Sequence, residues 1–350
     1  MNENIGRAKD ESCGSVFFIQ IIVKKKTRGR RKEQVMSSKI TIIGAGSVGS
    51  TIAYTLASEA IASEIVMIDI NKEKVEGEVM DILQGTCFRS PISMIAGDYE
   101  DAKDSDIVII TSGIARKPGQ TRIELTQTNV NIMKDIAPKI AKEAPNAIYI
   151  IVSNPVDIMT YVFTKISGIP EKQVIGSGTL LDTARLRCGI SEHFKVAQGN
   201  IHAYVFGEHG DTSFIPWTGA YISGVSVDEY YENMKALGKE IQPIDKEAML
   251  NYVQKSGGQI IAKKGATFYA VSVTVCKLVN LVLAASDTIT TVSSMMHGEY
   301  GIEDVCLSTL TLVGPNGIQG KVPMRMNKSE IEQLRKSADA LKNVIAQIDL

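Results

Sequence analysis

The sequence predicts an α/β fold in which a doubly wound parallel sheet is followed by an α+β domain. The first half of the chain alternates apolar strand patterns with helical patterns, and this order is typical of a parallel sheet. A glycine-rich turn over residues 44–49 supports the same fold, because it joins a buried strand directly to a helix. The alternation ends near residue 177, where the pattern changes to helices and hairpin-like runs.

Each element expected in the first half follows from its pattern of apolar residues. Short runs rich in isoleucine and valine indicate buried strands, whereas apolar residues three or four positions apart, such as Val75, Val79 and Ile82, indicate one face of a helix. Pro145 ends the longest helical pattern, and the Ser-Asn-Pro triplet at 153–155 ends the strand after it. In chain order we expect strand 40–43, helix 50–57, strand 64–69, helix 72–84, strands 92–96 and 106–110, helix 121–143, strand 147–152 and a short strand over 173–175.

The second half of the chain is expected to mix helices with antiparallel strands. Residues 200–206 alternate enough to indicate an antiparallel strand, and apolar runs over 288–323 indicate hairpins. An amphipathic helix over 328–348 closes the chain. The other helices are expected over 178–190, 227–237, 246–263 and 267–285.

The glycine-rich turn carries the spacing G-x-G-x-x-G, and each glycine has a physical task. Gly44 permits a tight turn, Gly46 lets the backbone approach a pyrophosphate, and Gly49 lets the helix pack on the strand. The helix that follows directs unpaired N–H groups and a positive dipole end at the phosphates. Alone, this spacing also marks ordinary turns, but strand and helix flank it here, so we predict a dinucleotide site on a Rossmann sheet.

An acid at the end of the next strand indicates which dinucleotide binds. Asp69 lies about twenty residues beyond Gly49, where a carboxylate accepts hydrogen bonds from the ribose hydroxyls. Its charge would repel the additional phosphate of NADP, so we predict NAD as the cofactor; the alternative is a surface acid at a strand end. We therefore assign residues 38–177 to an NAD-binding domain and residues 178–350 to a substrate domain.

Composition limits the class of protein. The chain has 350 residues, of which 44% are hydrophobic and 22% charged, as in soluble globular proteins, and no apolar run is long enough to cross a membrane. Its five cysteines are scattered without C-x-x-C spacing, which favours reduced thiols in the cytoplasm over disulfides or a metal site. We therefore expect a cytoplasmic protein without a bound metal.

Residues 1–37 form a basic N-terminal extension. Residues 1–35 hold nine Lys/Arg and four Asp/Glu, so the remainder carries 38 − 9 = 29 basic and 39 − 4 = 35 acidic residues. Such a basic run could bind nucleic acid or an anionic membrane. We instead expect the extension to be disordered, or to precede a natural start at Met36, with neither nucleic acid nor membrane as a partner.

One of the four histidines stands out as a candidate acid. His209 lies in a tight polar turn that follows a strand, and histidine is the side chain best suited to exchange a proton near neutral pH. Asp182, at the start of a helix, could hold that imidazole, and Arg185, one turn along, could bind a substrate carboxylate bidentately. Taken singly, each residue could equally form a structural salt bridge or a cap.

From about residue 38 to the C-terminus, the chain resembles the L-lactate/L-malate dehydrogenase family, and its bacterial lactate members most closely. Five motifs carry the resemblance in the family's order. They are the glycine fingerprint at 44–49, Arg-Lys-Pro-Gly-Gln-Thr-Arg at 116–122, Ser-Asn-Pro at 153–155, Leu-Asp-Thr-Ala-Arg at 181–185 and Gly-Glu-His-Gly-Asp at 207–211.

The resemblance implies a reversible hydride transfer between NADH and a small 2-oxo acid. His209 would give a proton to the ketone oxygen, Asp182 would orient the imidazole, and Arg185 would bind the substrate carboxylate. Arg122 would move in with a closing loop and polarise the carbonyl. Asn154 would form a hydrogen bond near the nicotinamide carboxamide and the reacting oxygen. Further residues assigned to the cofactor are Val48 and Gly113.

Different motifs point to different substrates. The position six residues before the loop arginine is usually Gln in lactate enzymes and Arg in malate enzymes, and here it is Arg116. A guanidinium there would pair with the second carboxylate of oxaloacetate. Thr267 and the Gly-Glu-His-Gly turn match the lactate pattern instead. The resemblance thus favours L-lactate dehydrogenase, with L-malate dehydrogenase as the alternative and a non-catalytic NAD-binding protein as a remote one.

The resemblance to bacterial lactate enzymes also suggests regulation and assembly. Arg187 and His202 match the positions that bind fructose bisphosphate at a subunit interface in the allosteric members, and both are basic, as a bisphosphate ligand requires. They could equally be an ordinary surface arginine and a strand histidine. The family further implies a homotetramer.

Overall fold

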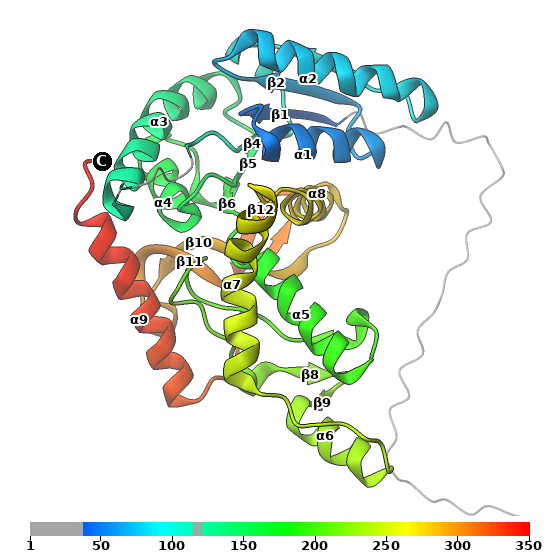
Figure 1. The fold of residues 1–350 in the computed structure, drawn as a ribbon. Coiled ribbons are helices and arrows are strands. Elements are labelled where there is room, and N and C mark those ends of the chain that lie inside the picture. Colours follow the sequence, from blue (N-terminus) through cyan, green and yellow to red (C-terminus); the bar gives the residue numbers. More distant parts are fainter. Residues whose placement is uncertain (1–37, 115–118, 120) are drawn as a thin grey trace, which may run out of the picture. The chain divides into compact units, whose positions relative to one another are not determined.

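A nine-stranded sheet runs through the computed structural model, which describes residues 38–114, 119 and 121–350 (Figure 1). The strand order within that part of the chain is β12-β11-β10-β6-β5-β4-β1-β2-β3. The strands are β1 (Lys39–Ile43), β2 (Glu64–Ile68), β3 (Ser93–Ala96), β4 (Ile107–Ile110), β5 (Ile148–Ile151), β6 (Val174–Gly176), β10 (Thr288–His297), β11 (Glu303–Gly314) and β12 (Gly317–Lys321).

The first six strands are parallel and form the predicted doubly wound arrangement. β1 pairs with both β2 and β4, and the chain continues outward from each of them to β3 and to β5 and β6. Strand order therefore reverses between β1 and β4, and in open α/β sheets a ligand binds at such a point, beyond the carboxyl ends of the strands. The predicted fold class is confirmed.

Successive residues of each central strand point to opposite faces, and each face has its own helical layer. Ile107 and Ile109 of β4 belong to a core cluster with helices α1, α2 and α8, whereas Val108 and Ile110 belong to a second cluster with α3, α4 and α9. In Figure 1, α3, α4 and α9 lie on the left, and α1 lies beside α8. The helices are α1 (Ser47–Ser58), α2 (Lys72–Gly85), α3 (Arg122–Glu143), α4 (Val156–Ile166), α8 (Tyr269–Leu283) and α9 (Lys328–Ile345).

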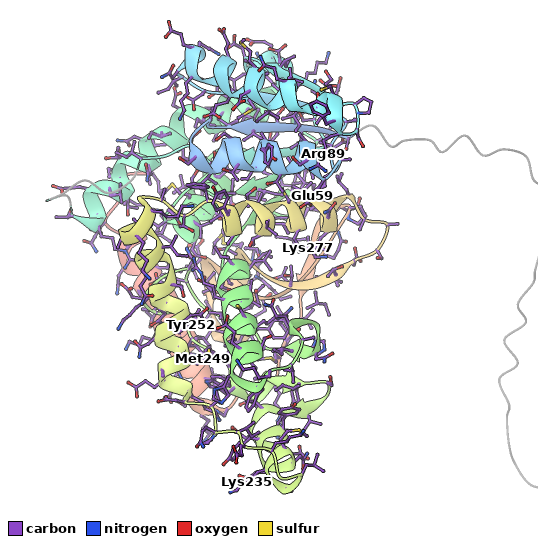
Figure 2. The ribbon with its side chains drawn as sticks, turned by 45° about the vertical axis from the view of Figure 1, so that its right-hand side comes forward. Glu59, Arg89, Lys235, Met249, Tyr252 and Lys277 are labelled. Atoms are coloured by element: carbon purple, nitrogen blue, oxygen red, sulfur yellow. The ribbon has the colours of Figure 1, made fainter. Side chains whose placement is uncertain are left out.

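A smaller α+β region has a core of its own. Apolar residues of helices α5 and α7 pack with those of a three-stranded sheet in a separate cluster. The two helices approach closely at Gly189 of α5, where a Cβ would lie 2.6 Å from the sulfur of Met249 (Figure 2). The elements are α5 (Leu180–Phe194), β7 (Ile201–His202), β8 (Tyr221–Ile222), β9 (Val225–Ser226), α6 (Val227–Ala236) and α7 (Lys246–Lys264).

Two expectations about individual elements were wrong. Helix α4 was not expected, although its polar residues Asp157, Thr160 and Thr164 recur at helical spacing. The strand expected over 200–206 is limited to β7, and only an isolated bridge joins Phe206 to Phe214. The hairpins expected over 288–323 are present as β10, β11 and β12, and they also extend the first sheet through antiparallel pairing of β10 with β6.

The domain division at residue 177 remains a prediction, and residues 1–37 lie outside the described part of the chain. Among the helices that the structure describes, none combines the length and apolar character needed to cross a bilayer. Within residues 38–114, 119 and 121–350, four cysteines are free, and no cluster of three His, Cys, Asp or Glu could hold a metal ion.

Candidate active site

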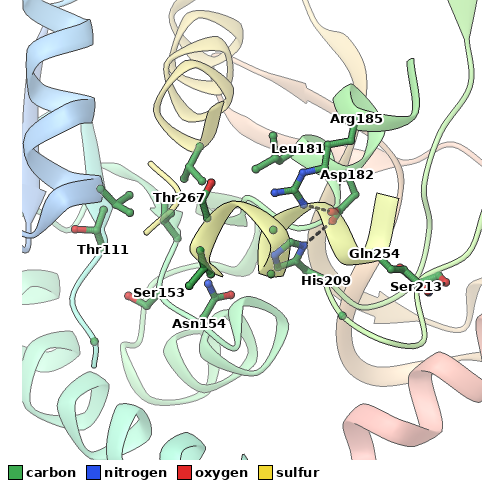
Figure 3. Close-up of a pocket in the computed structure, with 18 of the residues that line it drawn as sticks. Thr111, Ser153, Asn154, Leu181, Asp182, Arg185, His209, Ser213, Gln254 and Thr267 are labelled. Atoms are coloured by element: carbon green, nitrogen blue, oxygen red, sulfur yellow. Dashed lines mark hydrogen bonds and ion pairs between the residues drawn. The ribbon is translucent and has the colours of Figure 1, made fainter. Parts of the chain in front are cut away.

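A cleft of ≈ 470 Å³ opens where β4 and β5 end and where helix α5 begins (Figure 3). Its wall combines residues of the parallel sheet with residues of α5, α7 and the turn at 209–211. The residues predicted from the sequence that line it are Val48, Gly113, Asn154, Asp182, Arg185, His209 and Thr267.

His209, Asp182 and Arg185 form a continuous hydrogen-bonded chain in this cleft. Nδ1 of His209 lies 2.5 Å from one carboxylate oxygen of Asp182, and Nη1 of Arg185 lies 2.8 Å from the other (Figure 3). Asp182 is only 4% exposed, so little water screens the attraction between its charge and those of His209 and Arg185. Because Nδ1 faces the carboxylate, the other ring nitrogen of His209 is left for a ligand.

Strand β11 fixes both the histidine turn and the start of α5. The backbone N–H and carbonyl of Gly207 bond to the carbonyl and N–H of Ser308, each over 3.0 Å, two residues before His209. The hydroxyl of the same serine accepts the N–H of Thr179, the N-cap of α5, over 3.0 Å. Gly178, at φ +51°, permits this approach, since a Cβ there would lie 2.3 Å from the serine oxygen.

A second buried carboxylate holds the backbone of the histidine. Oδ2 of Asp157, in the first turn of α4, accepts the N–H of His209 over 2.7 Å. Asp157 is 3% exposed, and its Oδ1 has no hydrogen-bond partner among the residues that the structure describes. The carboxylate thus lies against the candidate acid without itself lining the cleft.

The protonation of these groups follows from their surroundings. The carboxylate of Asp182 raises the pKa of His209 above its ordinary value, outweighing the opposing effect of desolvation. Burial would raise the pKa of Asp182, but the charges and hydrogen bonds of His209 and Arg185 outweigh burial and lower it. Burial raises the pKa of Asp157 to about 6. The site therefore favours an imidazolium beside an ionised Asp182, which suits His209 to donate a proton.

Arg122 lies beside the histidine turn and is held by two acids. Its Nη2 is 3.5 Å from Oε2 of buried Glu208, and its Nη1 is 3.7 Å from Oδ2 of Asp211. Gly210 leaves room for this contact, because a Cβ there would lie 2.9 Å from the Glu208 carboxylate. The arginine is half-exposed and is not among the described residues that line the cleft.

The glycine-rich turn has the geometry that a dinucleotide needs. Gly44 has φ +108°, and a Cβ on Gly49 would lie 1.8 Å from the Gly44 carbonyl oxygen, so neither position tolerates a side chain. A Cβ on Gly46, the N-cap of α1, would meet nothing within 4 Å, and the first turn of that helix has no acid. Asp69 accepts the N–H of Ala45 over 2.6 Å, which holds it beside this turn. These residues fit a bound pyrophosphate and ribose.

The residues predicted for effector binding and for substrate choice do not line the catalytic cleft as the structure describes it. Arg187 bonds through Nε to the carbonyl of Ala203 and lies over the Tyr204 ring in a separate hollow of ≈ 420 Å³. His202 is exposed on β7 and is not one of the described residues lining that hollow. Arg116 lies outside the described residues, so its predicted role in substrate choice remains a prediction.

Sequence reasoning did not assign roles to several residues that shape the site. Asp157 and Ser308 act through backbone groups distant in sequence, and no local pattern marks such contacts. Gly257 and Gly258 line the cleft from the middle of α7. Only this pair had a sequence signal, since adjacent glycines are unfavourable inside a helical pattern.

Fold and site together define a dehydrogenase that uses a nicotinamide dinucleotide and acts on a small 2-hydroxy acid. The chain belongs to the lactate/malate dehydrogenase family: residues 38–176 match its NAD binding domain and residues 179–349 its alpha/beta C-terminal domain. The predicted family and the predicted cofactor, NAD, are confirmed.

Individual relatives and solved structures agree with this placement. The chain is 46% identical to an L-lactate dehydrogenase of Thermoanaerobacter pseudethanolicus, over 89% of this chain and 100% of the relative. It is 45% identical to L-lactate dehydrogenase 1 of Clostridium acetobutylicum, over 89% and 99%. The crystal structure of a minor L-lactate dehydrogenase from Enterococcus mundtii superposes with a TM-score of 0.85 at 34% identity, covering 90% of this chain and 99% of that one.

Proposed function

We propose that the protein is a cytoplasmic L-lactate dehydrogenase, which interconverts pyruvate and L-lactate. The observation that carries this proposal is the chain of hydrogen bonds from Arg185 through Asp182 to His209 in one cleft. This chain places a cation that can bind the substrate's carboxylate beside a group that can donate a proton to the substrate's carbonyl oxygen. NAD, when bound, supplies the hydride acceptor or donor.

In the direction of pyruvate reduction, each side chain of the site has a distinct task. The guanidinium of Arg185 pairs with the substrate carboxylate and fixes the orientation of the carbonyl group. His209 gives its proton to the carbonyl oxygen, which becomes the hydroxyl of lactate. Asp182 stabilises the imidazolium before transfer and holds the ring in place afterward. Arg122, beside the same turn, is placed to bring a second positive charge toward the developing oxyanion.

The choice of lactate over malate rests on the relatives and on the histidine turn. Relatives at 44–46% identity bear the name L-lactate dehydrogenase. Glu208, next to His209, is the residue of this turn that matches the lactate pattern. Arg116 is the feature that supports malate instead.

A direct assay distinguishes the two substrates. NADH oxidation is measured with pyruvate and with oxaloacetate, for the wild type and for Arg116→Gln. We expect the wild type to prefer pyruvate by kcat/KM. In the variant, pyruvate turnover should be equal or better, and activity on oxaloacetate should fall ten-fold or more, because a bidentate pair worth about 1.5–3 kcal/mol is lost. A wild-type preference for oxaloacetate would establish the malate alternative. NADH binding without turnover of either substrate would leave only a non-catalytic NAD-binding protein.

We further propose that the protein is a homotetramer whose activity responds to fructose bisphosphate through Arg187 and His202. Light scattering coupled to size exclusion tests the assembly. Titration of activity with fructose bisphosphate, in the wild type and in Arg187→Ser, tests the effector site. A wild type that does not respond to the effector would exclude that site.

A further inference from the structure

Helix α7 presents one face to the catalytic cleft, and the centre of that face has no side chains. Four of its residues line the cleft, with the i, i+3, i+4, i+7 spacing of a single helical face. The outer positions are Gln254 and Ile261, and the inner positions are Gly257 and Gly258. The face is thus hollowed midway along the cleft wall.

Gly258 has no structural reason to be glycine. Glycine is unfavourable in a helix interior relative to alanine, so it is usually explained by a close contact or a positive φ. Gly189 on α5 shows the first reason, since Met249 fills the space beside it. A Cβ on Gly258, by contrast, would meet nothing within 4 Å, and its φ is not in the left-handed region. Gly258 is exposed and lines the cleft, so the space beside it is free of protein atoms.

The neighbouring glycine places this space beside the substrate-binding arginine. A Cβ on Gly257 would lie 3.4 Å from Nη2 of Arg185. A 2-oxo acid with its carboxylate on Arg185 and its carbonyl oxygen on His209 has one substituent left on the carbonyl carbon. The helix face next to Arg185 offers that substituent room at Gly258 and an apolar boundary at Ile261.

We propose that Gly257 and Gly258 form a side-chain recess that admits 2-oxo acids with aliphatic substituents of two to four carbons, in addition to pyruvate. This inference rests on the proposed function and narrows its substrate class. The recess recognises the substituent by shape and apolar contact, since glycine backbone and the Ile261 side chain offer no charge to a second carboxylate.

The test compares kcat/KM for pyruvate, 2-oxobutanoate, 2-oxopentanoate and 4-methyl-2-oxopentanoate, with NADH as the reductant. In the wild type we expect 2-oxopentanoate to retain at least a tenth of the kcat/KM of pyruvate. Gly258→Leu should lower the ratio of 2-oxopentanoate to pyruvate at least ten-fold, because the leucine occupies the recess. In Gly258→Ala the alanine favours the helix, and the same ratio of 2-oxopentanoate to pyruvate should fall at least three-fold.

Gly77→Leu in α2 provides a matched control. Gly77 is also exposed inside a helix, and a Cβ there also meets nothing within 4 Å, but it is not one of the described residues that line the cleft. Its substrate ratio should equal that of the wild type.

Two results would overturn the recess while leaving the proposed function standing. One is a wild type that turns over pyruvate but whose kcat/KM for 2-oxopentanoate is below one tenth of that for pyruvate. The other is a ratio that Gly258→Ala leaves unchanged, a measurement that does not depend on the leucine variant folding. No turnover of any 2-oxo acid would overturn the proposed function, and the inference with it.

Discussion

The N–H of His209 donates to the carboxylate of Asp157 over 2.7 Å, while the imidazole of the same residue bonds to Asp182. Two buried carboxylates, from α4 and α5, therefore hold the candidate acid by its main chain and by its side chain. The two carboxylates act on His209 in different ways. Asp182 sets the protonation of the ring, and Asp157 sets the position of the turn from which the ring projects.

This division predicts different effects for two substitutions of Asp157. Asp157→Asn keeps an oxygen that can accept the His209 N–H, whereas Asp157→Ala leaves that N–H unpaired, at a cost of about 1–3 kcal/mol. We expect Asp157→Ala to lower the free energy of unfolding by about that amount and to lower kcat with pyruvate, because the turn that carries the ring is no longer fixed, and Asp157→Asn to lower kcat much less. NADH affinity by fluorescence titration serves as the control. Equal losses in the two variants would remove the hydrogen bond as the cause.

Asp157 should also affect the pH dependence of stability. Its pKa is raised from 3.8 to about 6, so the folded protein retains a proton that the unfolded chain releases. This contribution to stability is present below pH 3.8 and is lost as the pH rises to about 6, a change of about 3 kcal/mol at 1.36 kcal/mol per pH unit. Urea unfolding at fixed protein concentration should show Asp157→Asn gaining stability relative to wild type over this range. Parallel curves for the two proteins would contradict the prediction.

The alkaline limit of pyruvate reduction should depend on Asp182. Reduction requires the protonated imidazole, and Asp182 raises the pKa of His209 above 6.5, so kcat/KM should fall as the pH rises through that higher value. Asp182→Asn removes the charge and should move this limb of the profile to lower pH, with a loss of activity of at least about ten-fold at neutral pH. The measurement is kcat/KM for pyruvate between pH 5 and 9. A limb that stays in place would assign the titration to another group.

Cofactor preference should follow the charge of Asp69. Its carboxylate is fixed beside the glycine-rich turn by the Ala45 N–H, where the 2′-phosphate of NADPH would approach it. The wild type should strongly favour NADH over NADPH, and Asp69→Ser should narrow the ratio of kcat/KM values by relieving this repulsion. An unchanged ratio would show that Asp69 does not contact the ribose.

Local patterns predicted the fold because the central strands are apolar runs bounded by glycine and polar residues. The same reasoning missed α4, although Asp157, Thr160 and Thr164 recur there at helical spacing. It also failed to join β10 to β6, because antiparallel pairing between segments more than a hundred residues apart leaves no local mark.

In the candidate site, too, local motifs predict some residues, and only the fold reveals the others. His209, Asp182 and Arg185 were predictable because their chemistry resides in the side-chain type and in the motifs around them. Asp157 and Ser308 act through main-chain hydrogen bonds, which depend on the fold and not on a motif. The role of Gly258 depends on an empty volume, which becomes visible only once α7 is placed against the cleft.

Because Ser308 anchors both the turn of His209 and the start of α5, the acid and its carboxylate share one attachment on β11, next to the edge strand β12 of the large sheet. Proteins often lose activity on heating through local loosening of a loop, well before the rest of the chain unfolds. Here the half-life of activity at high temperature should instead match the half-life of the sheet, followed by far-ultraviolet circular dichroism. Residual activity would then report directly how many molecules still have an intact β11.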